Sequence, residues 1–351
     1  MSASNPNADR PTVVVIGGGY AGISIAGALD AEADVTLVEP KDTFVHNIGA
    51  LRATVDTEFL PRIFLPYDGL LSEGRVVRAR ATEVEAGRVV LDNGEELSAD
   101  VVVLATGSSY PFPAKTDALD AASSQQRYRD FQAELAGAES VLLLGAGPVG
   151  LELSGEISHA WPEKKVTLAD LGDDILAGPF RQDLRDELRR QLAERGIELV
   201  LGADPAALSA DLTVACHGVA PTSDYLGAGL AATRTPAGFL EVTPELRLRG
   251  QDSVFVAGDL ADGHLSMAVT AFQHAATVAA NVSALIRGEE LTAHEAGSPL
   301  ILVPLGPEGG AGQSPESDSI LGPDQVSEMK GRGLMIENVA ESLGATGAGA
   351  V

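Results

Sequence analysis

The sequence has little cysteine, little positive charge and no long apolar run, and each shortage excludes a class of protein. Cys216 is the one cysteine among 351 residues, so an intrachain disulfide and a Cys-x-x-Cys redox pair are excluded. No uninterrupted apolar stretch approaches the ~20 residues that span a bilayer. The polar segment before Pro11 lacks the basic and apolar regions of a signal peptide. We therefore expect a soluble protein of the cytoplasm.

Basic residues are heavily outnumbered, since 24 Lys and Arg stand against 50 Asp and Glu and give a net charge of −26. A surface of this sign repels nucleic-acid backbones and acidic lipid headgroups. We expect no nucleic-acid partner and at most a weak peripheral contact with a membrane. High solubility is the favoured meaning of the charge, and an acid-specific function is the less favoured one.

One pattern of strand, glycine turn, helix and strand occurs twice in a chain long enough for two or three domains. In the first copy a strand from Thr12 to Ile16 leads into the turn, a helix runs to about Leu29, and the segment "VTLVE" ends at Glu39. The glycines stand in G-x-G-x-x-G spacing at Gly17, Gly19 and Gly22. This order is typical of a dinucleotide-binding unit.

Each part of the pattern has a physical reason. The first glycine allows the tight turn, the second lets the backbone approach a pyrophosphate, and the third permits close helix–strand packing. The start of the helix offers unpaired N–H groups and a positive dipole end to the phosphates. The acid at the end of the second strand accepts hydrogen bonds from ribose hydroxyls.

The second copy follows the same order. A strand from Val141 to Leu144 leads into the turn, a helix runs to about His159, and "VTLAD" ends at Asp170. Its glycines are Gly145, Gly147 and Gly150. A further repeat pairs "ADVVVLATG" (99–107) with "ADLTVACHG" (210–218), each an apolar strand that closes on a glycine. Two complete copies make a ligand-free turn an improbable explanation for either.

Other elements surround the repeats. Asn93-Gly94 predicts a hairpin within a small antiparallel meander from about Arg75 to Leu97. The corresponding part of the second unit is shorter, so a second meander is expected to be reduced or absent. A strand over 254–257 ends in Gly258-Asp259, and a largely buried helix follows. A short helix over 335–343 is expected to dock on the core rather than to enter a membrane.

Two dinucleotide units with an Ala-Gly-Asp strand end resemble the FAD-dependent pyridine nucleotide–disulfide oxidoreductase superfamily. Within it, "KDTFVHNIGALRA" (41–53) resembles the apoptosis-inducing-factor-like proteins of the ferroptosis-suppressor (AMID) group, as do "ATGSSYPFPAK", "SSQQ", "PEKKVTL" and "MAVTAFQHA". The resemblance implies an FAD-dependent NAD(P)H:quinone oxidoreductase, related to type II NADH dehydrogenases.

The resemblance also implies an α/β fold with two Rossmann-like domains, the NADH domain inserted into the FAD domain. The FAD domain would comprise residues 1–115 and 236–290, the NAD(P)H domain 116–235, and a short C-terminal segment 291–351. A small β-meander would accompany them.

Site residues follow from the resemblance, position by position. Those implied for FAD are Gly17, Gly18, Gly19, Tyr20, Ala21, Gly22, Glu39, Lys41, His46, Asn47, Arg52, Val76, Ala105, Thr106, Gly107, Gly258, Asp259, Met267 and Ala268. Those implied for NADH are Gly145, Gly147, Pro148, Val149, Gly150, Glu152, Asp170 and Gly218. Asp259 would hold the ribityl–phosphate part of FAD, and Val76 would place its backbone near the adenine. The helix that begins at Met267 and Ala268 would direct its positive end at the flavin pyrimidine ring and favour the anionic reduced flavin.

Glu152 and Glu156 lie at i and i+4 on one helix face, where the family has an acid near the nicotinamide and flavin. Glu156 is the candidate catalytic residue, either as an acid that positions nicotinamide or relays a proton, or as a structural partner of a basic group. His46 with Asn47 either lines the flavin site or is packed, and His274 is expected to be packed in a buried helix. Cys216 is expected to be a buried structural cysteine, and no residue is assigned as a metal ligand.

The chain departs from the family at three places. Ser2 follows Met1, so a myristoyl anchor is not implied. The second closing motif reads Cys216-His217-Gly218 where Thr-Gly is usual, and His217 is expected to alter the loop beside the nicotinamide. The C-terminal segment lacks aromatic residues and a basic cluster, which argues against strong membrane attachment.

The expected reaction passes a hydride from NADH to flavin N5 and then two electrons to a quinone-type acceptor, because no dithiol is present to carry them. Asp170 favours NADH over NADPH, since an acid accepts bonds from a 2′-hydroxyl and repels a 2′-phosphate. One alternative is a reductase of ferredoxin or rubredoxin, which the charge of −26 disfavours. The other is a slowly turning redox sensor that binds FAD and NADH tightly. The particular quinone and the oligomeric state stay open.

Overall fold

The computed structural model describes residues 10–202, 204, 207–295 and 300–345. The first domain is built on a five-stranded parallel sheet with the order β16-β9-β1-β2-β5. Its strands are β1 (Thr12–Ile16), β2 (Asp34–Val38), β5 (Arg75–Val77), β9 (Val101–Leu104) and β16 (Val254–Val256). Runs of buried Val, Leu and Ile are typical of parallel strands covered on both faces.

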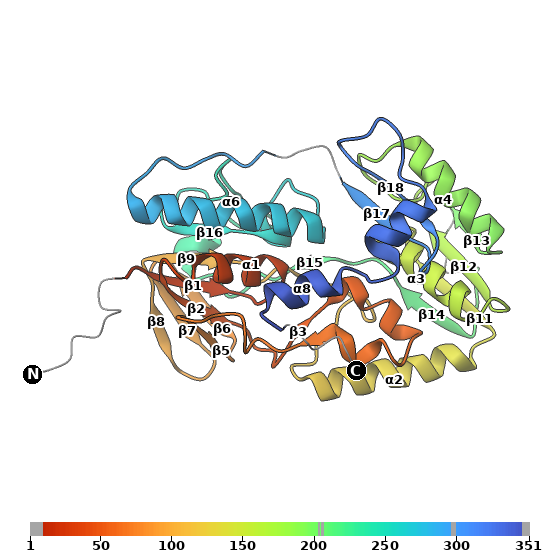
Figure 1. The fold of residues 1–351 in the computed structure, drawn as a ribbon, viewed down its shortest axis with the longest axis horizontal. Helices are drawn as coiled ribbons and strands as arrows, with labels where there is room; N and C mark the ends of the chain where they lie inside the picture. Colours follow the sequence, from red (N-terminus) through yellow and green to blue (C-terminus); the bar gives the residue numbers. More distant parts are fainter. Residues whose placement is uncertain (1–9, 203, 205–206, 296–299, 346–351) are drawn as a thin grey trace, which may run out of the picture.

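The two faces of this sheet carry different layers. Val13 and Val15 of β1 point into a core formed with the helices α1 (Tyr20–Leu29) and α6 (Ala268–Arg287), which pack on each other (Figure 1). Val14 and Ile16 point into a second core on the opposite face. That core is closed by the meander of β6 (Ala81–Glu85), β7 (Arg88–Leu91) and β8 (Glu96–Ser98), and by the short helix α5 (Ala228–Ala231). The alternation of side chains along one strand thus produces a three-layer domain.

The meander begins later than the sequence predicts. Residues 75–77 form β5, which pairs in parallel with β2 instead of joining the antiparallel strands. The outer edge of β2 would otherwise leave its backbone groups unpaired, and local alternation cannot distinguish the two pairings. The hairpin at Asn93-Gly94 is confirmed, with φ of +86° at Gly94 between β7 and β8. In the described part of 202–211, no strand lies between β13 (Glu198–Leu201) and β14 (Leu212–Ala215), as expected for the second unit.

The second domain contains a four-stranded parallel sheet with the order β13-β12-β11-β14. Its strands and helices are β11 (Ser140–Leu144), β12 (Lys165–Asp170), β13 (Glu198–Leu201), β14 (Leu212–Ala215), α3 (Pro148–Ala160) and α4 (Gln182–Glu194). Asp120 is the N-cap residue of helix α2 (Ala121–Gly137), and its carboxylate accepts a hydrogen bond from the Ser123 N–H. The helix packs partly on the first domain, against the 3-10 turns at 52–54 and 60–63.

Short strands connect the domains and their edges. An antiparallel pair joins β10 (Ser108–Ser109) to β15 (Ala220–Pro221), where the chain leaves and re-enters the first domain. Another pair joins β3 (Phe44–Val45) to β4 (Phe64–Leu65). The expected domain boundaries stay predictions, but α5, which belongs to 116–235, packs on β6 of the first domain.

The C-terminal segment contacts both domains. Its hairpin of β17 (Ile301–Pro304) and β18 (Gly310–Gln313) packs on α3 and α4, and the helix α7 (Pro323–Val326) packs on this hairpin (Figure 1). A π-turn follows over 327–331. Helix α8 (Ile336–Ser342) buries Val339 in the core of the first domain, which confirms the expected docking helix.

Helix α6 alone among the described helices has the length and apolar composition to cross a membrane. Nine of its residues, among them Val278 and Val282, are buried between α1 and its other neighbours. The helix therefore has the packing of a core helix. Ser2, where the expectation about a lipid anchor falls, lies outside the described residues.

Candidate active site

The first glycine turn lies where β1 ends and α1 begins. Gly17 has φ of +102°, and a Cβ on it would lie 2.5 Å from the Ala105 carbonyl oxygen, so only glycine fits. A Cβ on Gly22 would lie 1.8 Å from the Gly17 carbonyl oxygen, which explains the close contact of helix and turn. Gly19, the N-cap of α1, has no heavy atom within 4 Å of the position that its Cβ would take. The backbone is therefore open there to a phosphate.

The second glycine turn repeats this geometry. Gly145 has φ of +115°, and its Cβ would lie 2.8 Å from the Cys216 carbonyl oxygen. A Cβ on Gly150 would lie 1.9 Å from the Gly145 oxygen, while Gly147 is open. Pro148 and Val149 begin α3 directly after this opening. The sequence repeat is thus a repeat of three-dimensional structure.

The two acids at the strand ends occupy equivalent positions. Glu39 accepts hydrogen bonds from the backbone N–H groups of Gly18 (2.7 Å) and Lys41 (3.0 Å). Asp170 accepts them from Ala146 and Gly172, both at 2.7 Å. In each case one bond reaches into the glycine turn and the other goes to the residue two positions on. Both carboxylates are held beside the opening where a ribose would follow the pyrophosphate.

Asp259 lies on the same edge of the first sheet, after β16. Gly258 has φ of +70°, and the Asp259 carboxylate accepts hydrogen bonds from the Ser108 hydroxyl (2.5 Å) and the Lys115 ammonium (3.3 Å). Lys115 was not among the expected site residues, although it closes the run "ATGSSYPFPAK". The expected residues Ala105, Thr106 and Gly107 continue from β9 into this group. The carboxyl ends of β1, β2, β9 and β16 therefore meet around one opening, as in other open parallel sheets.

His46 and Asn47 lie beside the first glycine turn. The buried His46 ring hydrogen-bonds the Leu334 carbonyl oxygen through Nε2 (2.7 Å) and the Tyr20 hydroxyl through Nδ1 (3.3 Å). Burial lowers the pKa of His46 to about 4, so the ring is neutral at physiological pH. The Asn47 side-chain oxygen is buried and has no hydrogen-bond partner in the described part of the chain. Such an atom needs a partner, and a bound cofactor is one.

Two buried ion pairs join α3 to the rest of the molecule. Glu156 is held by Arg52 through two hydrogen bonds of 2.5 and 2.8 Å, and the side chains are 3% and 8% exposed. Arg52 also donates to the Gly331 carbonyl oxygen. Glu152 accepts a hydrogen bond of 2.8 Å from Lys330, and burial raises the pKa of Glu152. Arg52 is therefore the basic group that Glu156 was expected to pair with if its role is structural.

The start of α6 has no side-chain cap, which is compatible with the flavin-facing role expected of it. Met267 is the N-cap residue, its side chain makes no capping hydrogen bond, and Ala268 begins the helix. Val76 lies on β5 opposite Leu37, next to the end of β2. The ammonium of Lys41 donates to the Thr116 carbonyl oxygen, and burial lowers its pKa. These positions all border the carboxyl edge of the first sheet.

The second closing motif is buried at its first residue and exposed at the next two. Cys216 is 2% exposed, and burial raises its pKa to about 12, so it is a structural thiol, as expected. Its carbonyl oxygen accepts the Tyr110 hydroxyl (2.6 Å). Gly218 has φ of +105°, while His217 is exposed beside it.

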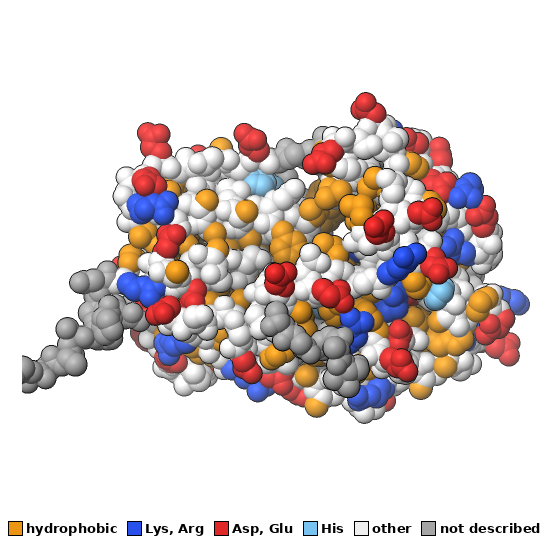
Figure 2. Space-filling view, viewed as in Figure 1, with side chains coloured by type: hydrophobic (Ala, Val, Ile, Leu, Met, Phe, Trp, Pro, Cys, Tyr) orange, Lys and Arg blue, Asp and Glu red, His pale blue; other side chains and the backbone are white. Residues whose placement is uncertain are grey.

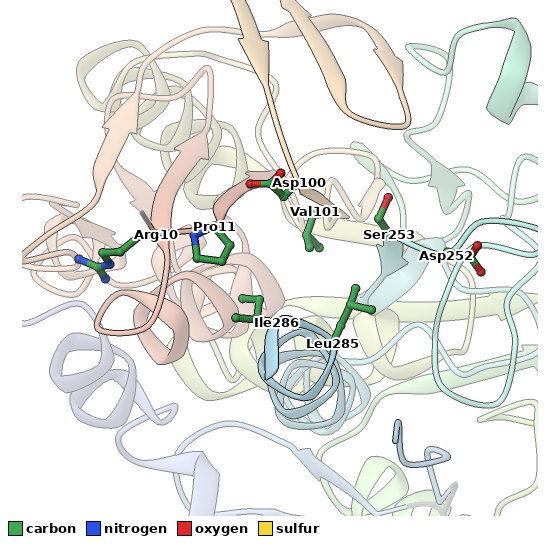
Figure 3. Close-up of a pocket in the computed structure, with 8 residues that line it drawn as sticks. All are labelled: Arg10, Pro11, Asp100, Val101, Asp252, Ser253, Leu285 and Ile286. Carbon is green, nitrogen blue, oxygen red and sulfur yellow. The ribbon is translucent and has the colours of Figure 1, made fainter. Parts of the chain in front are cut away.

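Two of the cavities on the described part of the chain bear on where the site lies. One of about 350 Å³ lies between the domains and is lined by Arg52, Glu156, His159 and the loop 55–58. A larger one of about 640 Å³ is lined by the residues that precede β1, β9 and β16 and by the end of α6 (Figure 3). Because it lies at the amino ends of these strands, it is on the opposite side of the sheet from the glycine turns. We place the chemistry at the carboxyl edge.

Comparison with known proteins supports this assignment. The family model described as pyridine nucleotide-disulphide oxidoreductase matches residues 11–275, and the chain belongs to this family. It is 27% identical to apoptosis-inducing factor homolog B of Dictyostelium discoideum, over 95% of this chain and 97% of the relative. It is 29% identical to ferroptosis suppressor protein 1 of Xenopus laevis, over 95% and 96%.

Solved structures show the same fold. The sulfide:quinone oxidoreductase of Aquifex aeolicus superimposes with a TM-score of 0.70 at 16% identity, over 95% of this chain and 92% of that one. The curated relatives confirm the resemblance to the AMID group, and the solved structure confirms an α/β fold of Rossmann-like domains. The chain is an oxidoreductase of a flavin- and nicotinamide-dependent family.

The residues present fit both cofactors. Gly19 and Gly147 leave room for a pyrophosphate, Glu39 and Asp170 stand where ribose hydroxyls would lie, and Asn47 offers an unpartnered buried oxygen. The assignment of each expected site residue to a cofactor atom stays a prediction.

Proposed function

We propose that this protein is an FAD-dependent NADH:quinone oxidoreductase. The observation that carries the proposal is the pair of equivalent open glycine turns, combined with a lone cysteine that is 2% exposed. Two turns provide for two dinucleotides, and the buried thiol cannot relay electrons as an exposed dithiol does. The resemblance to the ferroptosis-suppressor group supports a quinone, and a sulfide:quinone oxidoreductase shares the fold; ferredoxin reductases share it too, so a protein acceptor is the alternative to test.

Bound FAD would supply the redox chemistry, which couples hydride donation by NADH to two-electron reduction of the quinone, with the second proton of the hydroquinone taken from solvent. The chain itself supplies binding and orientation. The turn at 17–22 and the carboxylate of Glu39 would hold the adenosine diphosphate part of FAD, and Asp259, fixed by Ser108 and Lys115, would hold the ribityl–phosphate part. The N-terminus of α6, which has no side-chain cap, would stabilise negative charge on the flavin ring.

The second domain would orient NADH. The turn at 145–150 presents backbone N–H groups and the start of α3 to the pyrophosphate. Asp170 would accept a hydrogen bond from the ribose 2′-hydroxyl and would repel a 2′-phosphate, so we propose NADH as the preferred donor. Glu156 is the proposed catalytic residue; Arg52 fixes its carboxylate in place, where it would position the nicotinamide or move a proton.

The surface favours a small acceptor over an acidic protein. Acidic side chains are spread over both halves of the face shown in Figure 2 and are accompanied by basic ones, without a single basic patch on that face. With a net charge of −26, docking of an acidic ferredoxin or rubredoxin is disfavoured. We also propose a cytoplasmic location, which cell fractionation would test.

Anaerobic titration tests the proposal directly. The purified protein should show a flavin spectrum, NADH should bleach it, and a soluble quinone analogue should restore it with many turnovers per second. A colourless protein that cannot be reconstituted with FAD would overturn the proposal. Bleaching with negligible turnover would replace the enzyme by the slow redox sensor. Faster oxidation by a ferredoxin than by any quinone would assign a protein acceptor.

A further inference from the structure

Three histidines that are distant in the sequence meet on one side of α6. His264 lies in the loop before the helix, His274 lies in its second turn, and His294 lies in the segment that follows it. Their ring centroids are 4.5 to 5.6 Å apart, and one nitrogen of each ring lies within 4.8 Å of the others. The cluster is separate from the ion pairs and glycine turns described above.

The spacing suits a metal ion. His274 Nε2 and His264 Nδ1 are 3.3 Å apart. Zinc–nitrogen bonds of about 2.0–2.1 Å in a tetrahedral site place neighbouring nitrogens about 3.3–3.4 Å apart. The third nitrogen, on His294, must approach from within 4.8 Å. His264 and His294 are partly exposed, and His274 is fully buried. The rings of His264 and His294 therefore lie on the side of the buried His274 ring that solvent can reach.

Hydrogen bonds prepare His294 for coordination. The Thr277 hydroxyl donates to the Gln273 carbonyl oxygen, so its oxygen accepts a bond from His294 Nδ1–H at 3.0 Å. This places the His294 proton on Nδ1 and leaves the Nε2 lone pair free. A second-shell oxygen that orients a histidine in this way is usual at metal sites.

We propose that His264, His274 and His294 form a three-histidine site for a divalent transition-metal ion of the zinc class, with water as the remaining ligand. Imidazole nitrogens select zinc, copper, nickel and cobalt over the hard cations magnesium and calcium. The ion joins the loop before α6, the helix and the segment after it. No relative's name and no motif of the sequence points to this site.

Coordination replaces two hydrogen bonds of His274. Gly258 N–H now donates to His274 Nδ1 at 3.2 Å, so the His274 proton is on Nε2, from which it is donated to His264 Nδ1 at 3.3 Å. When Nε2 binds the ion, this proton moves to Nδ1 and both bonds are lost. Loss of two neutral hydrogen bonds weakens binding by about 5- to 150-fold. The site is thus expected to be weaker than a purely structural zinc site, and metal would act on the turn that carries Asp259.

Titration of the full chain with zinc tests the proposal. The FAD-loaded protein is stripped with a chelator, desalted and titrated with Zn²⁺ by calorimetry in excess Mg²⁺, which occupies surface carboxylates. The variants are His264→Gln and His294→Gln, whose side chains are partly exposed, and the matched control is His159→Gln, an exposed histidine outside the cluster. Melting curves confirm that each variant is folded.

We expect one Zn²⁺ per chain in the unchanged protein and in His159→Gln, and at least about tenfold weaker binding in each cluster variant. Co²⁺ should give visible absorption bands of nitrogen coordination that both variants lose. Absence of a saturable zinc site in excess Mg²⁺, or equal binding by the cluster variants, would overturn the proposal and leave a packed histidine cluster. Because the readout is metal stoichiometry, its failure leaves the proposed reaction untouched.

Discussion

The ion pair between Arg52 and Glu156 offers the sharpest test of how the domains are held together. Two hydrogen bonds join the side chains, which are 8% and 3% exposed, and Arg52 also donates to Gly331 of the C-terminal segment. Replacing Glu156 with Leu removes one charge and leaves the buried guanidinium without a carboxylate. Breaking a buried pair in this way costs about 3–5 kcal/mol of unfolding free energy.

Replacing both partners should be far milder. In the double variant Arg52→Met with Glu156→Leu, neither charge is buried, and such replacements are often neutral in stability. The matched control is Glu58→Leu, because Glu58 lines the same cavity but is exposed. We expect the melting temperature to fall by ~6–10 °C in Glu156→Leu, from about 2 °C per kcal/mol. The double variant and the control should remain near the starting value.

The assay is thermal melting of the FAD-loaded protein, and NADH oxidation is measured on the same samples. An unchanged melting temperature in Glu156→Leu would refute the reasoning, because a buried unpaired guanidinium cannot be free of cost. Turnover of the double variant then separates the two roles of Glu156. Restored stability with lost turnover assigns the Arg52–Glu156 pair to cofactor binding or the chemistry, and restored stability with normal turnover leaves Glu156 a purely structural role.

Three further predictions follow from the site and its surroundings. Asp170→Ser should lower kcat/KM for NADH by ~10- to 150-fold, since a charged hydrogen bond to ribose contributes about 1.5–3 kcal/mol. The same variant should lower kcat/KM for NADPH less. An unchanged ratio of kcat/KM for NADH to kcat/KM for NADPH in steady-state kinetics would contradict the ribose role. The pKa of His46 is about 4 when folded against 6.5 when unfolded, so its neutral state stabilises the fold above pH 6.5 and this contribution is lost as pH falls towards 4. Urea unfolding at several pH values should show a loss of about 3 kcal/mol over that window, which His46→Gln should flatten; equal slopes for both proteins would count against it. Cys216→Ala should keep full turnover with a stability loss of about 1 kcal/mol, and a large loss of quinone reduction would mean that the thiol carries electrons.

Local signals in the sequence predicted most of the architecture. The strand Thr12–Ile16 and the helix end at Leu29 agree with the structure, and the docking helix near the C-terminus agrees to within one residue at each end. These predictions succeed because short-range backbone geometry decides them, above all the positive φ at Gly17 and Gly145. The strand at 75–77 was misassigned because its partner β2 lies far along the chain, and no local pattern distinguishes a parallel edge from a meander.

The site residues differ in the same way, because those with a local sequence signal were predicted and those that depend on distant contacts were not. Glu39 and Asp170 were predicted because each closes the second strand of a repeated unit, after the glycine turn and the helix. Lys115 was missed, since its contact with Asp259 spans 144 residues. The basic partner of Glu156 was expected only as a class, and the structure identifies it as Arg52, 104 residues away.

By itself, the sequence determined that this protein has two dinucleotide units and no dithiol, because glycine spacing and cysteine count are local or additive properties. Tertiary structure alone decided which charges are buried against each other and which histidines meet. Arg52 with Glu156, Lys330 with Glu152 and the three histidines around α6 are each brought together by packing of elements that are remote in the chain. Such contacts depend on how cores close and not on the residues beside them, so they become visible only in the folded chain.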